Sequence, residues 1–184
     1  MSSISSGYTM KWKDKLINYL IEQLSNDKEW QEVVNRIKTE RSIGVHLAVF
    51  TEPFLSLICK GEKSIESRFS QSKITPFDKV SKGDVVLVKE SGGYVKAVFI
   101  AGEVKYYTYL NDTRLKEIED AYGEHICSKY DSAFWESRTK ANFATLIEIK
   151  ALRNLKPFYI DKNDRTGWST IKLGYGNTLF SWNH

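Results

Sequence analysis

The sequence predicts an α+β fold in which a small, partly open β-barrel carries a few helices and follows an N-terminal helical extension. Three observations support this prediction. Apolar residues recur at helical spacing over residues 12–38, where neither proline nor glycine occurs. From residue 45 onward the apolar segments become short and are separated by turn residues, which is typical of strands. The chain has 184 residues, a length that suits one compact domain with an appendage.

The extension is predicted to be a pair of helices. One apolar stripe runs from Leu16 to Leu24 and a second runs from Trp30 to Ile37. The Ser-Asn-Asp sequence at residues 25–27 interrupts the pattern and offers a cap for the second helix. The helix pair could pack on the main domain or on a second copy of the chain.

The character of the sequence changes at Arg-Ser-Ile-Gly, residues 41–44. We place the boundary there, which gives a helical extension over residues 1–42 and a main domain over residues 43–184. The main domain opens with the apolar segment VHLAVF at 45–50, which we interpret as a strand.

A short helix is expected over residues 51–61, directly after this strand. Thr51 suits its N-cap, Pro53 its first turn and Gly61 its end. The remaining elements are expected to be strands at residues 63–69, 85–90, 94–104, 143–155 and 168–173, with one further helix after Asp112.

Composition and charge exclude several classes of protein. The net charge of +4 is mildly basic, which is compatible with a polyanionic partner. Cys59 and Cys127 lie far apart and outside any C-x-x-C pair, so we expect no disulfide framework, no metal site and no cofactor. No apolar run approaches the roughly 20 residues that a membrane span needs, and the N-terminus lacks a signal-peptide pattern. We therefore expect a cytoplasmic protein without a membrane partner.

The segment GEKSIESRFS at residues 61–70 concentrates charge in a predicted strand. Alternation of side chains would place Ser64, Glu66 and Arg68 on one face, with Ile65 and Phe69 on the other. Two interpretations follow. On an exposed face, Glu66 and Arg68 would form a weak surface pair. On the inner wall of a barrel, they would be fixed recognition groups for an amine, a phosphate or a carbonyl edge.

The same segment resembles a known family. LSLICKGEKSIESR is similar to the signature of the activating-signal-cointegrator homology (ASCH) domain, in which a short helix precedes Gly-x-Lys-[Ser/Thr]-x-Glu-x-Arg. Gly61, Lys63, Ser64, Glu66 and Arg68 all fit this pattern. The flanking sequences TEPFL and SKGDVVLV occur in the expected order. The resemblance covers about residues 45–173 and does not include the N-terminal helices.

The resemblance implies a PUA-like fold, a small mixed β-barrel with helices at its rim. Domains of this kind are usually RNA binders or readers of modified nucleobases, and their signature residues line a cleft. It therefore implies that Lys63, Ser64, Glu66 and Arg68 contact a ligand. A few ASCH proteins are enzymes: one type removes the acetyl group from acetylated cytidine, and ribonuclease activity is also known in the family.

Lys63 is the candidate nucleophile or base of the signature, which would require a depressed pKa. In the amidohydrolase members a threonine three residues later assists the lysine, and here Glu66 takes that position. We expect this carboxylate to raise the pKa of Lys63 and keep it protonated. A charged Lys63 suits a phosphate better than nucleophilic attack.

Other candidate ligand contacts come from three further segments. Lys89 and Ser91 end a predicted strand next to a glycine pair, where a backbone could approach a ligand. Trp135 and Trp168 could each stack on a base, although a core position is the simpler interpretation of Trp168. For nucleic-acid backbone attraction, the candidates are the loop lysines Lys73, Lys79 and Lys82.

The leading functional hypothesis is a domain that binds RNA or a modified nucleotide, with Lys63, Glu66 and Arg68 in its cleft. The first alternative is a hydrolase acting on RNA or on a modified nucleoside, of the ribonuclease or acetylcytidine amidohydrolase type. The second alternative is a regulatory adaptor, in which residues 12–38 bind a protein partner or form a homodimer. The sequence leaves open whether the protein is an enzyme.

Overall fold

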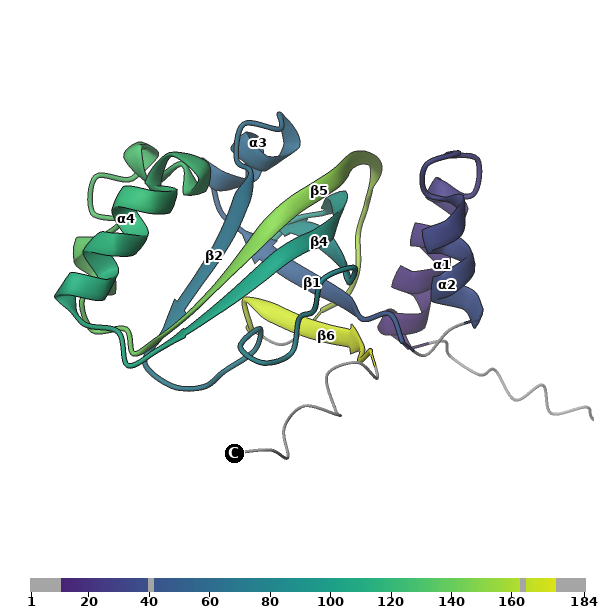
Figure 1. Cartoon of the computed structure of the whole chain (residues 1–184). Coiled ribbons are helices and arrows are strands. Elements are labelled where there is room, and N and C mark those ends of the chain that lie inside the picture. The colour runs from purple at the N-terminus through teal and green to yellow at the C-terminus, as the bar shows by residue number, and fades with distance from the viewer. Residues whose placement is uncertain (1–10, 40–41, 163–164, 175–184) are drawn as a thin grey trace, which may run out of the picture.

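The computed structural model describes residues 11–39, 42–162 and 165–174 (Figure 1). Its helices are α1 (Trp12–Leu24), α2 (Gln31–Thr39), α3 (Phe54–Cys59) and α4 (Asp112–Ile126), followed by the single 3-10 turns η1 (Ser128–Tyr130) and η2 (Glu136–Arg138). Its strands are β1 (Val45–Phe50), β2 (Ile65–Ser70), β3 (Val85–Glu90), β4 (Val95–Thr108), β5 (Phe143–Phe158) and β6 (Trp168–Lys172).

The strands form one six-stranded sheet in the order β2-β5-β4-β3-β1-β6. β1 and β3 run parallel, and every other neighbouring pair is antiparallel. The register between the long strands β4 and β5 shifts at three places, and such irregularities increase strand twist and bending. The sheet consequently curls into a half-barrel (Figure 1). The predicted small, mixed and partly open barrel with peripheral helices is confirmed.

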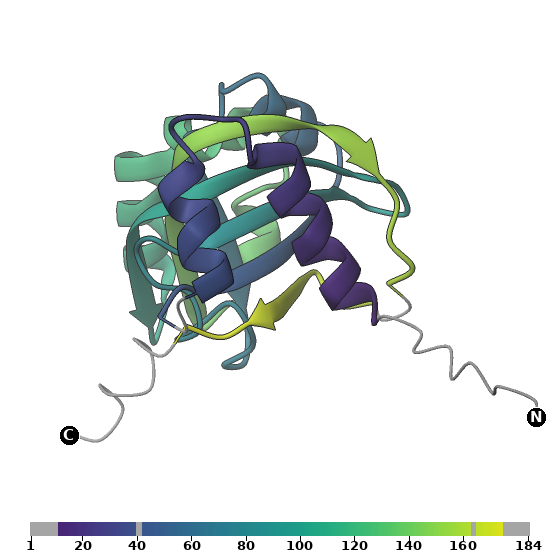
Figure 2. The ribbon, with the colours of Figure 1, turned by 90° about the vertical axis from the view of Figure 1, so that its right-hand side faces the viewer.

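The two N-terminal helices cover one face of the sheet, as Figure 2 shows. Their apolar stripes are buried there, and the predicted break between the helices is also confirmed. Asp27 accepts a hydrogen bond from the Glu29 amide in that break, and its carboxylate also pairs with Arg153 of β5 at 2.7 Å. The shared core joins Leu16, Leu20, Leu24, Trp30, Val34 and Ile37 to Val45, Leu47, Val85, Leu87, Val95, Val98 and Leu155 of the sheet. Of the two packings considered for the helix pair, the structure shows the one on the main domain.

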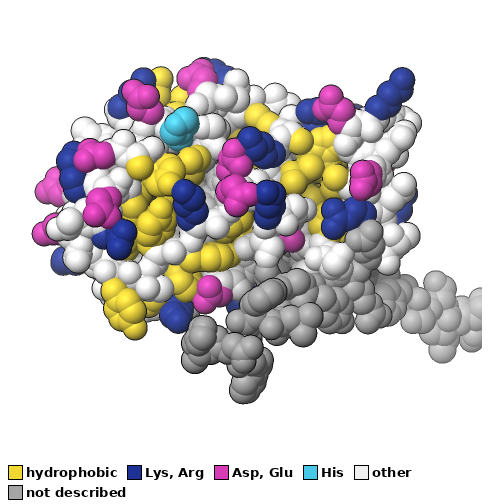
Figure 3. All heavy atoms as spheres, viewed as in Figure 1, with side chains coloured by type: hydrophobic (Ala, Val, Ile, Leu, Met, Phe, Trp, Pro, Cys, Tyr) yellow, Lys and Arg dark blue, Asp and Glu magenta, His cyan; other side chains and the backbone are white. Residues whose placement is uncertain are grey.

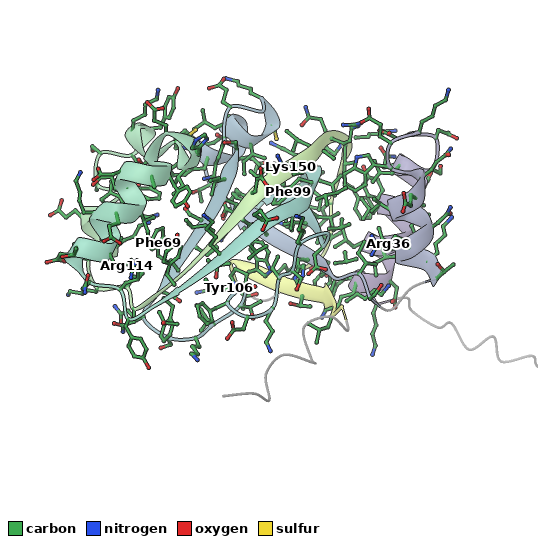
Figure 4. The ribbon with its side chains drawn as sticks, in the orientation of Figure 1. Arg36, Phe69, Phe99, Tyr106, Arg114 and Lys150 are labelled. Atoms are coloured by element: carbon green, nitrogen blue, oxygen red, sulfur yellow. The ribbon has the colours of Figure 1, made fainter. Side chains whose placement is uncertain are left out.

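A second apolar core fills the other side of the curled sheet. Phe50, Leu55, Ile58, Phe99 and Trp168 are among its buried members, so α3 is held against β1, β4 and the start of β6. Phe99 lies in the middle of the sheet (Figure 4). A smaller cluster around Ile118, Ile126, Phe134 and Leu146 seats α4 against β2 and β5.

The predicted strands are all present, with shifted ends. β4 continues to Thr108, past the predicted end at residue 104, because its last residues still pair with the start of β5. The expected N-cap of α3 was wrong. Pro53 occupies the cap position, and the carboxylate of Glu52, not Thr51, accepts hydrogen bonds from the Ser56 amide and hydroxyl at 3.1 and 2.8 Å. A glutamate side chain reaches one turn ahead, which the shorter threonine cannot do.

Candidate functional site

A cavity of about 370 Å³ opens where β2, the end of β1, the start of α3 and the turn η2 meet. We call it the base cavity. Its walls combine charged and aromatic side chains. The lining residues are Val49, Phe50, Thr51, Phe54, Lys63, Glu66, Ser67, Arg68, Phe69, Phe134, Ser137 and Arg138.

Lys63 reaches the base cavity because of how α3 ends. Gly61 adopts a φ of +75°, in the left-handed region that favours glycine. The chain then turns back, so that the Leu57 carbonyl accepts the amides of both Glu62 and Lys63, at 2.9 and 3.1 Å. The Lys63 ammonium donates to the Ile126 carbonyl at 2.8 Å, at the C-terminal end of α4 where a cation is favoured.

The Lys63 ammonium is almost completely removed from water, since only 3% of the residue is exposed. Burial lowers the pKa of Lys63, and this effect outweighs the nearby Glu66 carboxylate, which acts to raise it. Glu66 acts in the expected direction, but the expectation that Lys63 would have a raised pKa was wrong, because burial lowers the pKa by more. The sequence shows the carboxylate neighbour but not the loss of solvent around the ammonium.

Glu66 is buried between two cations. Its carboxylate lies 2.6 Å from Arg68 Nε and 3.5 Å from Lys63 Nζ. Glu66 and Arg68 therefore share one face of β2, as side-chain alternation predicts. The pair is not a solvated surface pair, because Glu66 is only 3% exposed.

Most N–H groups of the Arg68 guanidinium donate hydrogen bonds to other groups of the protein. Besides Nε, its Nη2 donates to the Val49 carbonyl at 2.9 Å and its Nη1 donates to the Gly167 carbonyl at 3.3 Å. The guanidinium also lies against the rings of Phe50 and Trp168, at 4.9 and 5.4 Å from their centroids. Arg68 thus ties the edge strand β2 to β1 and to the start of β6, across the opening of the half-barrel.

Aromatic rings supply the apolar part of the base cavity. The rings of Phe54 and Phe134 meet edge-on with centroids 5.8 Å apart, and Lys63 Nζ lies 5.4 Å from the Phe54 centroid. Phe69, on the α4 side of β2 (Figure 4), contacts Phe134 edge-on at 6.2 Å. The arrangement gives a guest both a ring to stack on and buried polar groups to pair with.

Several sequence-predicted site residues lie outside the base cavity. Ser64 contacts His125 Nδ1 at 2.9 Å and lines a different hollow, of about 400 Å³, between α4 and the sheet. Hydrophobic side chains gather on this face beside α4, with charged side chains around them (Figure 3). Trp135 packs edge-on against Phe69 and Phe134 and does not line the base cavity.

The candidates near the ends of β3 and β6 are also separate from the base cavity. Lys89 is buried and donates to the Glu90 carbonyl, while the Ser91 amide donates to the Phe50 carbonyl. Trp168 is a core residue, 5% exposed, whose indole N–H donates to His46 Nδ1 at 3.3 Å.

The three loop lysines are exposed. Lys73 Nζ lies 5.8 Å from the Phe77 centroid, and Lys82 pairs with Glu103 on the surface. Lys79 is exposed as well. None of these lysines lines the base cavity.

Two general features concern the described part of the chain. No group of three or more His, Cys, Asp or Glu side chains among the described residues could hold a metal ion. No helix among the described residues is long and apolar enough to cross a membrane.

Sequence reasoning missed Phe54 and Arg138 as cavity residues. Phe54 belongs to the TEPFL flank noted above and Arg138 follows Trp135 by three positions, but little in the local sequence distinguishes them from ordinary surface or core residues. The position of Arg138 four residues after Phe134 is the one signal that could have drawn attention to it, because residues four apart share a face of a helical turn.

Comparison with known proteins gives similarity at the level of the fold. The ASCH protein of Zymomonas mobilis is 10% identical to this chain and superposes with a TM-score of 0.55. The match covers 76% of this chain and 92% of the Zymomonas chain. A point mutant of the ASCH protein from the same organism is 11% identical, with a TM-score of 0.50, and the match covers 64% of this chain and 75% of the mutant chain. An ASCH domain from Lactobacillus crispatus is 15% identical over 78% of this chain and 96% of its own, with a TM-score of 0.40.

No family model and no curated protein matches the sequence. The structural likeness nonetheless agrees with the sequence resemblance noted above. The chain therefore has the curled half-barrel fold of the Zymomonas ASCH structures.

Proposed function

We propose that the base cavity binds a single nucleobase, presented by RNA or by a modified nucleotide. One observation carries the proposal: aromatic faces and a buried, mutually fixed set of charged groups line the same small cavity. The ASCH-like fold supports it, because the resemblance implies RNA or modified-base recognition at these signature residues.

The size and chemistry of the base cavity suit such a guest. Small-molecule pockets usually measure about 300–1,000 Å³, and this cavity of about 370 Å³ lies near the lower limit. The partly exposed ring of Phe54 offers a surface for stacking, a contact that every base can make, while Phe134 is buried behind it. Lys63 and Glu66 offer a donor and an acceptor within 3.5 Å of each other, which matches the alternating polar edge of a base.

The exposed lysines Lys73, Lys79 and Lys82 would add attraction to the nucleic-acid backbone without selecting a sequence. Their contribution depends on salt, because each neutralised phosphate of a single strand releases counterions. Specific recognition would then come from the base cavity and general affinity from the loop.

Binding of short single-stranded RNA across a salt series tests the proposal. Phe54→Leu keeps an apolar side chain but removes the ring, so affinity should fall about fivefold or more, the lower end of base-stacking energies. Tyr159→Leu is the matched control, because Tyr159 is an exposed aromatic that does not line the base cavity. Equal losses in both variants, or RNA binding unaffected by Phe54→Leu, would contradict the proposal.

A hydrolase acting at Lys63 is the second candidate, and one observation favours it. Burial lowers the pKa of Lys63, which is what a lysine needs to act as a base or nucleophile. Incubation with acetylated cytidine and with mixed RNA tests this function. Lys63→Arg should abolish turnover because arginine stays protonated, whereas the exposed Lys82→Arg should not change it. Turnover that survives Lys63→Arg removes Lys63 from the mechanism.

A further inference from the structure

Arg138 lies where two hollows meet. It lines the base cavity and also an adjoining hollow of about 460 Å³. Phe69 and Ser137 are shared by the two hollows in the same way, so the hollows adjoin at this point. The adjoining hollow is lined by Phe69, Ser70, Gln71, Ser72, Ile74, Ser137, Arg138, Lys140 and Ala141.

The guanidinium of Arg138 is held in a fixed orientation. Its central carbon lies 3.5 Å from the Phe134 ring centroid and 5.6 Å from that of Phe69. Its Nη1 donates to the Phe134 carbonyl at 2.5 Å and to the Ser137 hydroxyl at 2.7 Å. Among the described residues, no hydrogen bond is made by its Nε or Nη2. The Nε–Nη2 edge of the guanidinium can therefore donate hydrogen bonds to a ligand.

Arg138 also lacks a counter-ion. No carboxylate of the described residues forms an ion pair with it, although burial lowers its pKa and so disfavours the isolated charge. Asp131 and Glu66 act on Arg138 only at longer range. Glu66 is already engaged by Lys63 and Arg68, so the cavity has three cations and one anion in its wall.

We propose that Arg138 binds the phosphate of the guest whose base occupies the base cavity, so that the ligand is a nucleotide or an RNA phosphodiester and not a free nucleoside. This inference rests on the proposed function and adds that the ligand carries a negatively charged phosphate. A phosphate accepts two parallel N–H bonds from the free edge of a guanidinium, which is the geometry that Arg138 offers.

The adjoining hollow could hold the next nucleotide of a strand, on the far side of the phosphate bound by Arg138. Beyond Arg138 its wall carries the polar side chains of Ser70, Gln71 and Ser72 and the cation Lys140. Ile74 and Ala141 add apolar surface to this wall. A neighbouring nucleotide of a single strand would therefore find apolar contacts for its base and polar and positively charged groups for its backbone, which favours a phosphodiester over a terminal phosphate as the source.

Calorimetric titration of the full chain tests the inference. The probes are the four common ribonucleosides, their 5′- and 3′-monophosphates, and tetranucleotides of RNA. At least one monophosphate or tetranucleotide should bind about tenfold or more tightly than its nucleoside, as expected for a charge-assisted pair of hydrogen bonds. Arg138→Gln should remove that advantage, so that the nucleotide and its nucleoside then bind within about twofold of each other.

Two variants and one control separate recognition from folding. Arg138→Lys keeps the charge but loses the fork, so it should retain only part of the phosphate advantage. Arg114→Gln is the matched control, because Arg114 is exposed on α4, pairs with Glu117 and does not line the base cavity. Thermal melting of each variant confirms that the fold is retained.

The outcomes are distinct. Equal binding of nucleosides and nucleotides, or an Arg138→Gln loss that is the same for both, overturns the inference while the proposed function stands. Absence of binding by every probe overturns both. If tetranucleotides bind more tightly than monophosphates, and Arg138→Gln lowers the salt slope by about 0.7, the phosphate belongs to an RNA chain. Equal affinity for tetranucleotide and monophosphate assigns it to a free nucleotide.

Discussion

At the scale of single residues, the site depends on a charge held away from water. Lys63 keeps its ammonium in a buried position because two groups compensate it: the Glu66 carboxylate and the Ile126 carbonyl at the C-terminal end of α4. Glu66 is in turn fixed by Arg68 at 2.6 Å. Breaking one member of such a set leaves an uncompensated charge, which costs far more than breaking a surface pair.

The first prediction concerns Glu66. Glu66→Gln should lower the free energy of unfolding at neutral pH by about 3 kcal/mol, because it leaves the Lys63 ammonium buried without its carboxylate. Urea denaturation measures the change. The matched control is Glu103→Gln, which removes the exposed partner of Lys82 and should leave stability almost unchanged. Similar small effects in both variants would mean that the Lys63–Glu66 pair is hydrated in solution.

The second prediction concerns pH. Burial sets the pKa of folded Lys63 below its ordinary value of 10.5, so the unfolded chain binds the proton more tightly. The free energy of unfolding should therefore rise with pH between the folded pKa of Lys63 and about 10.5, and Lys63→Met should lack this rise.

Urea denaturation of both proteins across the alkaline range measures the difference. Lys89, whose pKa is also lowered by burial, is present in both proteins and cancels in the comparison. Parallel curves for wild type and Lys63→Met would show that the pKa of Lys63 is not lowered by folding.

At the scale of secondary-structure elements, Arg68 closes the open side of the half-barrel. The two edges of the sheet are β2 and β6, which share no backbone ladder. The Arg68 side chain spans this gap, from β2 to the carbonyls of Val49 on β1 and Gly167 before β6. A barrel that leaves its edges unpaired must cover or bridge them, and one side chain provides the bridge here.

The third prediction tests this bridge. Arg68→Lys keeps the charge but cannot reach both carbonyls and Glu66, so the loss of stability should be on the order of 2 kcal/mol. Hydrogen exchange of the Val49 amide, which donates to the Gly167 carbonyl at 2.9 Å, should become faster. Arg114→Lys on the exposed surface of α4 is the control and should change neither quantity. Unchanged Val49 protection in Arg68→Lys would exclude the bridging role.

At the scale of the whole molecule, the N-terminal helices and the sheet share one core. Leu16, Leu20 and Trp30 are fully buried against strand residues. The division into an extension over residues 1–42 and a domain over residues 43–184 stays a prediction about sequence organisation. A protein partner or second copy that uses residues 12–38 would have to contact the outer, polar side of α1 and α2, because their apolar stripes are already covered.

The fourth prediction concerns this shared core. Leu20→Ala should lower the free energy of unfolding by about 3 kcal/mol, as expected for a large-to-small change in a packed core. Because the helices and sheet share that core, the protein should still unfold in a single transition by circular dichroism and by tryptophan fluorescence. Ile74→Ala, at a residue that is 60% exposed, is the control and should have little effect. Two separate transitions in Leu20→Ala would show that the helices unfold independently.

Much of the fold could be predicted from local pattern. The strands appeared as short apolar runs between turn residues, and the helix pair appeared as two stripes at helical spacing. These signals depend on neighbours within a few positions, so they survive in the sequence itself. Glu66 and Arg68 of the signature lie on β2 and Lys63 lies just before it, and all three line the base cavity.

The sequence by itself therefore determined the elements, their approximate ends and the charged strand that borders the base cavity. Only the tertiary structure decided what those charges do. Lys63 is paired with a carbonyl 63 positions away, Arg68 with one 99 positions away, and the burial that lowers the pKa of Lys63 comes from elements far along the chain. Contacts of this kind leave no periodicity in the sequence, because they exist only after the sheet has curled and brought distant segments together.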